Sequence, residues 1–364
     1  MNPQSAAELA PWVTGGAFAL AFLFGAVGNR TNFCTMGAVS DWINMGDFGR
    51  MRMWLLAIAV AILGAAALQL AGIVDLSKSI YPGPNFTWLS YLVGGFLFGV
   101  GMTLGSGCGS KTLIRIGAGN LKSLVVYVFL GIAAYMTLRG LLGAFRVGVL
   151  EKATITFPAG QDLSSLLGVN RAILGALIGG GLLTFIYANK EFRANLDYSL
   201  GGIVTGLVVV GGWYVSGHLG RLAEDPNTLQ EAFVATNSAR MESFSFVSPL
   251  AYTLEYLMFW TDKSRVITYG IASAAGVIAG SDAYTLATKT FRWEGFRDAE
   301  DTANHIVGGA LMGFGGITAL GCTIGQGISG FSTLALGSII TFASIVAGAA
   351  AAMKLQYWRI AREG

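Results

Sequence analysis

The residues of this chain that are best suited to chemistry are its three cysteines, Cys34, Cys108 and Cys322. A glycine lies nine residues before each of them. Thiols at three equivalent positions could bind a soft metal such as Cu(I), exchange disulfides, or pass a sulfur-containing solute. Redox exchange usually uses a CxxC pair, which the sequence lacks. An odd number of widely spaced cysteines is neither a disulfide framework nor a zinc signature.

Polar and cationic residues flank these cysteines. Arg30 precedes Cys34, Lys111 and Arg115 follow Cys108, and Gln326 follows Cys322. Charge within a membrane segment is costly and marks function by default. Cations, together with the N-terminal ends of interrupted helices, favour an anion as the ligand. The competing interpretation is that Arg30 and Arg115 brace the fold or reach the membrane interface, and that Gln326 joins neighbouring helices.

The composition indicates whether these residues belong to a soluble or a membrane protein. Of the 364 residues 54% are hydrophobic and 12% are charged, and the mean hydropathy is +0.61. Since a soluble domain carries about 25% charged residues, the composition indicates an integral membrane protein. No basic stripe with interleaved aromatics supports nucleic-acid binding. With only His218 and His305, we expect no metal site, no cofactor and no enzyme activity.

The chain contains stretches long enough to cross a bilayer, which takes about 20 apolar residues. An apolar segment at 246–260 is too short and contains Pro249 and Glu255. We therefore predict nine transmembrane helices within a single domain, 1–364. The predicted spans are 12–28, 53–73, 88–105, 121–145, 170–188, 199–215, 266–286, 303–320 and 332–353.

The positions of Lys and Arg predict the orientation of these helices, because short cytoplasmic loops carry an excess of both residues. Basic residues occur in the connections 46–52, 189–197 and 287–302 and in the C-terminal tail. Nine spans place all four of these segments in the cytoplasm if the N-terminus is outside. The loop 217–245 is then external.

Glycine-rich runs at 99–120 and 313–330 predict broken or re-entrant helices, because glycine weakens a helix by about 1 kcal/mol relative to alanine. Shifting the chain by 214 residues superimposes Cys108 on Cys322 together with most of the preceding glycines. A third copy of this pattern has Val215 at the cysteine position, and a weaker fourth copy ends at Cys34. Pairing spans one with six and three with eight predicts two inverted repeats, roughly 12–150 and 199–353, joined by the connector helix 170–188.

Three motifs resemble the YeeE/YedE family of sulfur-transport membrane proteins: NRTNFCTMGAVSDW (29–42), GVGMTLGSGCGSKTLIRIGAGNLKSL (99–124) and GALMGFGGITALGCTIGQGISGFS (309–332). The resemblance covers nearly the whole chain. It implies a multi-pass protein of the bacterial inner membrane that imports thiosulfate along an hourglass-shaped path lined by Cys34, Cys108 and Cys322. It also implies a TusA-like soluble sulfur carrier as a possible cytoplasmic partner.

The chemistry of the residues agrees with this implication. Thiosulfate is a dianion with one soft terminal sulfur, and a neutral thiol is a weak S–H donor suited to that atom. Two other readings stay open at this point. One is a soft-metal or thiol-redox membrane protein that uses the same cysteines, and the other is a structural membrane protein whose repeats only pack.

Overall fold

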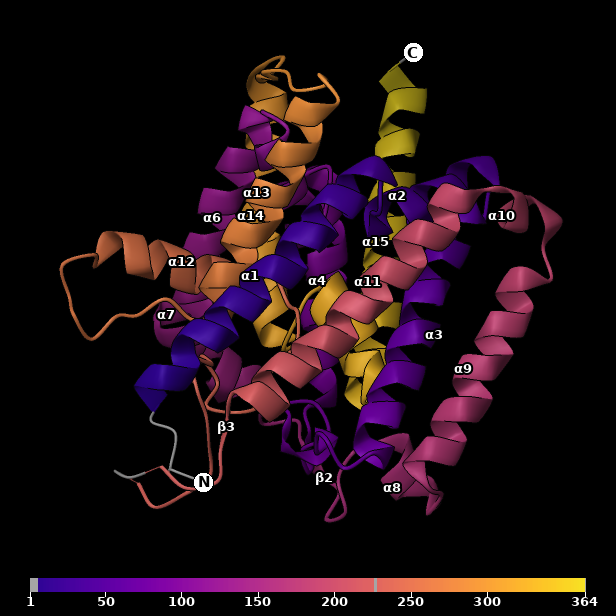
Figure 1. Ribbon diagram of the computed structural model, residues 1–364. Helices are drawn as coiled ribbons and strands as arrows, with labels where there is room; N and C mark the ends of the chain where they lie inside the picture. Colours follow the sequence, from indigo (N-terminus) through magenta and orange to yellow (C-terminus); the bar gives the residue numbers. More distant parts are fainter. Residues whose placement is uncertain (1–5, 226–227, 364) are drawn as a thin grey trace.

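In the computed structural model, which describes residues 6–225 and 228–363, the long apolar stretches fold as helices (Figure 1). The long helices are α1 (Ala6–Arg30), α3 (Gly49–Leu70), α4 (Trp88–Leu104), α6 (Leu121–Arg139), α9 (Arg171–Tyr187), α11 (Leu196–Tyr214), α13 (Tyr269–Ala287), α14 (Ala299–Thr318) and α15 (Leu336–Glu363). The short ones are α2 (Thr35–Ser40), α5 (Gly109–Gly117), α7 (Leu141–Phe145), α8 (Leu163–Leu167), α10 (Lys190–Ala194) and α12 (Ser248–Met258).

Tighter or wider helical turns and two small hairpins complete the fold. The 3₁₀ turn is η2 (Leu76–Lys78), and the π-helical turns are η1 (Asp41–Met45), η3 (Arg146–Leu150), η4 (Val215–Leu219) and η5 (Gly325–Gly330). The strands are β1 (Asn85–Phe86), β2 (Ile155–Thr156), β3 (Arg221–Leu222) and β4 (Ala232–Phe233). Antiparallel pairing joins β1 to β2 and β3 to β4.

Every predicted span overlaps one of the long helices. Within the described part of the chain, six helical stretches are long and apolar enough to cross a membrane. They are Ala6–Met45, Gly49–Leu70, Trp88–Gly117, Leu121–Arg139, Leu196–Leu219 and Leu336–Arg359. The segment expected to be too short forms α12, a helix of 11 residues. The protein is thus an all-helical, multi-pass membrane protein.

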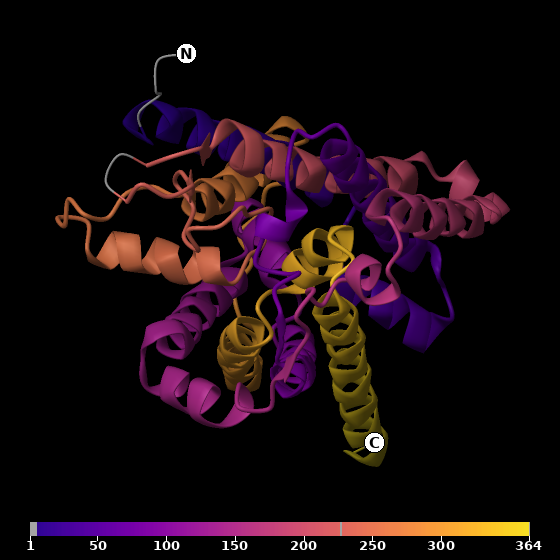
Figure 2. The same cartoon turned by 90° about the horizontal axis from the view of Figure 1, so that it is seen from below.

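The connections between helices lie at two ends of the bundle. Figure 1 shows the start of α1 with β2 and β3 at one end, and α10, the α13–α14 connection and the C-terminus at the other. Seen end-on, the segment from η5 to the start of α15 lies near the middle of the molecule, surrounded by longer helices (Figure 2). The interrupted helices therefore place their breaks inside the bundle.

Glycines allow the central helices to approach closely. A Cβ atom on Gly101 of α4 would lie 2.7 Å from the carbonyl oxygen of Gly308 on α14. A Cβ atom on Gly308 would lie 2.7 Å from the carbonyl oxygen of Gly101. Since neither backbone can move away without disturbing the turn that follows α4, only glycine fits this crossing.

Aromatic stacking secures the other side of the core. The indole of Trp54 on α3 lies between the rings of Phe33 and Phe342, with centroid separations of 5.8 and 4.9 Å. Phe33 immediately precedes Cys34, and Phe342 belongs to α15. Offset stacks of this kind add about 0.5–1.5 kcal/mol beyond burial. The stack therefore links the first cysteine to two long helices.

We expect Gly101→Val to separate α4 from α14 and to destabilise the protein by about 1–3 kcal/mol, the usual cost of overpacking. Thermal unfolding in detergent, followed by tryptophan fluorescence, measures the effect as a lowered Tm. Gly181→Val on α9 is the control, because no atom lies within 4 Å of its added Cβ. Equal Tm values for the two variants would contradict the close crossing.

Candidate functional site

Three of the long helices, α1, α4 and α14, end in a left-handed turn that leads directly to a cysteine; α3 and α13 end in the same kind of turn without one. In each of the first three, a residue with a left-handed backbone conformation stands two positions before a cysteine. The next N–H donates a hydrogen bond to the carbonyl five residues back, as in a Schellman cap. The left-handed residues are Asn32, Ser106 and Leu320, with φ of 50°, 57° and 57°. The closing hydrogen bonds are Phe33 to Gly28 (3.1 Å), Gly107 to Met102 (2.8 Å) and Gly321 to Gly316 (2.7 Å).

Each cysteine then begins a new helical segment. Cys34 is the N-cap of α2, and its Sγ accepts the Gly37 N–H at 3.5 Å. Cys108 is the N-cap of α5. The Sγ of Cys322 accepts the N–H of Gly325 at 3.4 Å and that of Phe246 at 3.3 Å. The expected breaks at the cysteine motifs are therefore present, and each thiol sits at a helix start.

The structure brings the three thiols together into what we call the thiol row, Cys34, Cys108 and Cys322. All three are free and buried. Cys108 interacts electrostatically with both of the others, and Cys34 lies within hydrogen-bonding reach of it. The Ser110 hydroxyl lies 3.3 Å from the Sγ of Cys108. Residues 288 positions apart in sequence thus share one buried site.

The third copy of the glycine pattern, which has Val215 at the cysteine position, behaves differently. α11 continues without interruption into η4, and Val215 has an ordinary right-handed helical conformation there. A Cβ atom on Gly16 of α1 would meet its side chain at 3.1 Å. This position therefore has neither a thiol nor a helix break, and it serves to pack α11 against α1.

One side of the thiol row faces a hydroxyl-rich cavity of about 270 Å³ that we call the serine cavity. Its lining includes Ser238, Ser243, Ser245, Ser248, Glu242, Tyr269 and Leu320. Ser245 lines this cavity, and its hydroxyl is 3.9 Å from the Sγ of Cys322, so this thiol lies directly behind the cavity wall. Burial raises the pKa of Glu242, so this carboxyl keeps its proton to a higher pH than a free glutamic acid does.

On the other side lies a cationic cavity of about 240 Å³ that we call the lysine cavity. Its lining includes Asn32, Lys111, Arg115, Asn120, Arg292 and Glu294. The Nζ of Lys111 donates to the Oδ1 of Asn32 at 3.2 Å, and it lies close enough to Cys34 and Cys108 to act on their charge. Lys111 is therefore the predicted cation that stands nearest to the thiols.

The other predicted binding residues have different surroundings. Arg30 forms an ion pair with Asp197 at 3.1 Å, and about half of each side chain is exposed. Arg115 donates to the carbonyl of Ser106 at 2.7 Å, which braces the break after α4. Gln326 donates to the carbonyl of Ala319 at 2.6 Å and accepts from Ser338. Arg115 and Gln326 thus hold the turns that position Cys108 and Cys322, and Arg30 is already neutralised.

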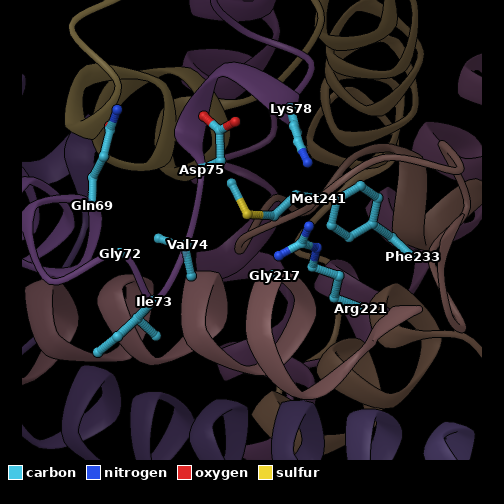
Figure 3. A pocket seen from close by; sticks show the side chains of 10 residues that line it. All are labelled: Gln69, Gly72, Ile73, Val74, Asp75, Lys78, Gly217, Arg221, Phe233 and Met241. Atoms are coloured by element: carbon cyan, nitrogen blue, oxygen red, sulfur yellow. The ribbon is translucent and has the colours of Figure 1, made fainter. Parts of the chain in front are cut away.

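A further cavity of about 280 Å³ lies beside η4 (Figure 3). Figure 3 shows the Met241 thioether in its middle, with Lys78 and Arg221 nearby. Both cations pair with Glu231, at 2.6 Å each. Asp75 also lines this cavity, so two carboxylates balance the two cations, and the cavity lacks the net positive charge of the lysine cavity.

Comparison with known proteins shows the family of this chain. The model of one protein family, described as sulphur transport, matches residues 30–351. The chain belongs to this sulphur transport family. The thiosulfate transporter TsuA of Escherichia coli (strain K12) is 26% identical over 315 residues, which cover 84% of each chain. The thiosulfate transporter TsuA of Spirochaeta thermophila is 24% identical over 333 residues, covering 87% of this chain and 91% of the relative.

Some residues beside the thiol row were not predicted from the sequence. Ser245 and Phe246 belong to an irregular segment, and no local motif marks them. Thr35 directly follows Cys34. The signal that could have found Thr35 is the short pattern Cys-Thr-x-Gly, which occurs at both Cys34 and Cys322.

We expect Arg115→Ala to destabilise this sulphur transport protein, because the carbonyl of Ser106 loses a charged donor inside the bundle. Such a loss costs about 1.5–3 kcal/mol. Thermal unfolding in detergent provides the measurement. Arg30→Ala is the control, since an exposed ion pair contributes about 0–1 kcal/mol. An Arg115→Ala protein as stable as Arg30→Ala would show that the break after α4 holds without this brace.

Proposed function

We propose that this protein imports thiosulfate or a closely related sulfur-containing anion, which passes along the thiol row from the serine cavity to the lysine cavity. The observation that carries this proposal is the burial of three free thiols between the serine cavity and the lysine cavity. The names of the two TsuA relatives supply the substrate class. No catalytic chemistry is part of the proposal.

The thiol row suits a soft anion. The backbone N–H groups of Gly37 and Gly325 donate to the Sγ atoms of Cys34 and Cys322, which leaves each S–H hydrogen free to donate to a ligand. A neutral thiol offers this hydrogen to the terminal sulfur of thiosulfate without repelling the dianion. Because each thiol is a weak donor, the substrate can leave one site for the next.

In this proposal the lysine cavity lies on the cytoplasmic side. In this proposal nine helices span the inner membrane as two inverted repeats, with the N-terminus outside. The basic α10, the α13–α14 connection and the C-terminus share one end of the bundle, as the excess of Lys and Arg requires (Figure 1). Lipid contacts the exposed apolar residues of peripheral helices such as α9.

The membrane potential opposes entry of a dianion by about 2.3 kcal/mol per charge for each 100 mV. Cations near Cys34 offset part of this cost at the inner end of the row. Removal of the substrate at that end offsets the rest. A TusA-like sulfur carrier acting at the lysine cavity would perform this removal, and we include such a partner in the proposal.

One observation favours a second candidate function. Cys34 and Cys108 lie within hydrogen-bonding reach, so the pair could serve thiol redox chemistry or bind a soft metal. Uptake of radiolabelled thiosulfate and of Cu(I) by cells that express the protein separates these functions. Transport of thiosulfate alone supports the first proposal, and transport of copper alone supports the second.

We expect Cys→Ala at position 34, 108 or 322 to leave the protein folded and to reduce thiosulfate uptake at least tenfold, because a gap in the row removes one binding site worth about 1.4 kcal/mol. Growth of a host that depends on thiosulfate as its sulfur source is the first measurement. Initial uptake rates then quantify the loss of transport, and Tm values show whether each variant is folded.

Cys→Ser at the same positions tests the softness of the donor. Serine keeps the approximate size and still donates, yet its oxygen is harder and reaches less far. We expect serine to restore less than half of the uptake at each position. Full uptake with all three serine variants would show that sulfur is not required in the row.

We expect Lys111→Ala to raise the KM for thiosulfate at least tenfold, with a smaller effect on the maximal rate. A unit charge about 4 Å from another is worth on the order of 4 kcal/mol at an effective dielectric constant near 20, before solvent screening. Lys190→Ala, an exposed cation at the same end of the bundle, is the control. Equal KM values for the two variants would remove Lys111 from the binding site.

A further inference from the structure

The tetrapeptide Cys-Thr-x-Gly occurs at both Cys34 and Cys322, and it adopts the same arrangement at both places. In each copy the cysteine stands two positions after a residue with a left-handed backbone conformation, and the glycine N–H donates to the cysteine Sγ. The middle thiol, Cys108, is followed by glycine and then by Ser110. The two copies therefore stand at the positions on either side of Cys108 in the thiol row.

The threonine of each copy has an unusual environment. Thr35 and Thr323 are 1% and 0% exposed. Neither hydroxyl has a hydrogen-bond partner of normal geometry among the residues that the structure describes. A buried hydroxyl without a partner costs about 1–3 kcal/mol. Thr31, on the same stretch of chain, pairs in the ordinary way by donating to the carbonyl of Val27 at 2.8 Å.

Thr323 lies at the transport path. Its side chain is beside the Cys108 thiol, and the preceding residue, Cys322, contacts Ser245 in the wall of the serine cavity. The hydroxyl therefore stands between two members of the thiol row. Thr35 directly follows the third thiol, Cys34, at the first position of α2.

We propose that the hydroxyls of Thr323 and Thr35 donate hydrogen bonds to the oxygen atoms of the transported anion while the neighbouring thiols contact its sulfur. This inference rests on the proposed function and names the substrate class more narrowly, as a sulfur oxyanion with a terminal sulfur. The hydroxyl is a hard donor suited to oxygen, and the thiol is a soft donor suited to sulfur.

Pairing a hydroxyl with a thiol makes the site selective against ions that offer only oxygen or only sulfur. Sulfate offers oxygen atoms to the threonine but no soft sulfur to the thiol. Hydrosulfide offers sulfur to the thiol but no oxygen to the threonine. A site built to donate to an oxygen leaves its hydroxyl unpaired when the ligand lacks that atom, so hydrosulfide binds more weakly.

Thr323→Val removes the hydroxyl and keeps the shape of the side chain. We expect it to raise the KM for radiolabelled thiosulfate about tenfold, which corresponds to about 1.4 kcal/mol. Inhibition of the remaining uptake by hydrosulfide should stay unchanged, because that ion does not use the hydroxyl. Thr323→Ser should restore a KM within about twofold of the original protein. Thr35→Val should resemble Thr323→Val.

Thr318→Val is the matched control. Thr318 lies on α14, four residues before Cys322, and it is also buried with an unpaired hydroxyl. It stands before the break, so its replacement should leave the KM unchanged. Tm values in detergent show whether each variant is folded, and Thr35→Val carries the test if Thr323→Val unfolds.

The outcomes separate this inference from the proposed function. If the original protein takes up no thiosulfate, the proposed function is wrong. If it does, an unchanged KM in Thr323→Val and Thr35→Val would overturn only the role of the hydroxyls. A similar rise in KM for Thr318→Val, or a parallel loss of hydrosulfide inhibition, would also overturn it, because both indicate a general structural effect.

Discussion

A helix that stops inside a membrane must satisfy its free backbone groups within the protein, and this constraint shapes the whole site. Bilayer hydrocarbon offers no hydrogen bonds, and each unsatisfied group costs several kcal/mol. Three helices meet the requirement with the same left-handed turn, which returns N–H groups to the last carbonyls. The next residue is a cysteine that starts a new helix, so the cap that ends one helix also positions a thiol.

The turns need reinforcement because their left-handed residues are not glycine. Leu320 holds a conformation that costs an L-residue roughly 1–2 kcal/mol. Gln326 spans the break beside it by donating to Ala319, and Arg115 does the same at Ser106. These polar side chains stand close to the thiols and yet serve mainly to hold the backbone. Proximity to a site and direct contact with a ligand are thus separate properties here.

Charge is distributed so that a cation beside the thiol row has no acidic partner. Arg30 is compensated by Asp197, and Lys78 and Arg221 share Glu231. Lys111 has Asn32, a neutral partner, and faces the thiol row. A cation whose partner is neutral keeps its attraction for a dianion, whereas an ion pair in a solvated setting presents little net charge. The serine cavity contributes hydroxyl donors, and Arg146 in its lining is paired with Glu151.

The sequence by itself determined the class of the protein and much of its helical layout. Its low charge excluded a soluble domain, its apolar stretches located every long helix, and its glycine-rich cysteine motifs marked the three breaks. Local composition suffices for these features because helix formation in a membrane depends on residues close in the chain. The number of helices that span the bilayer and their arrangement as inverted repeats stay predictions.

Only the tertiary structure decided which residues share the site. It joined Cys34 to Cys108, placed Ser245 and Phe246 at Cys322, and turned Arg30 toward Asp197. It also showed that Val215 continues a helix where the repeat pattern had aligned it with the cysteines. Spacing along the chain could not reveal these outcomes, because each depends on how helices far apart in sequence pack and on which polar groups then find partners.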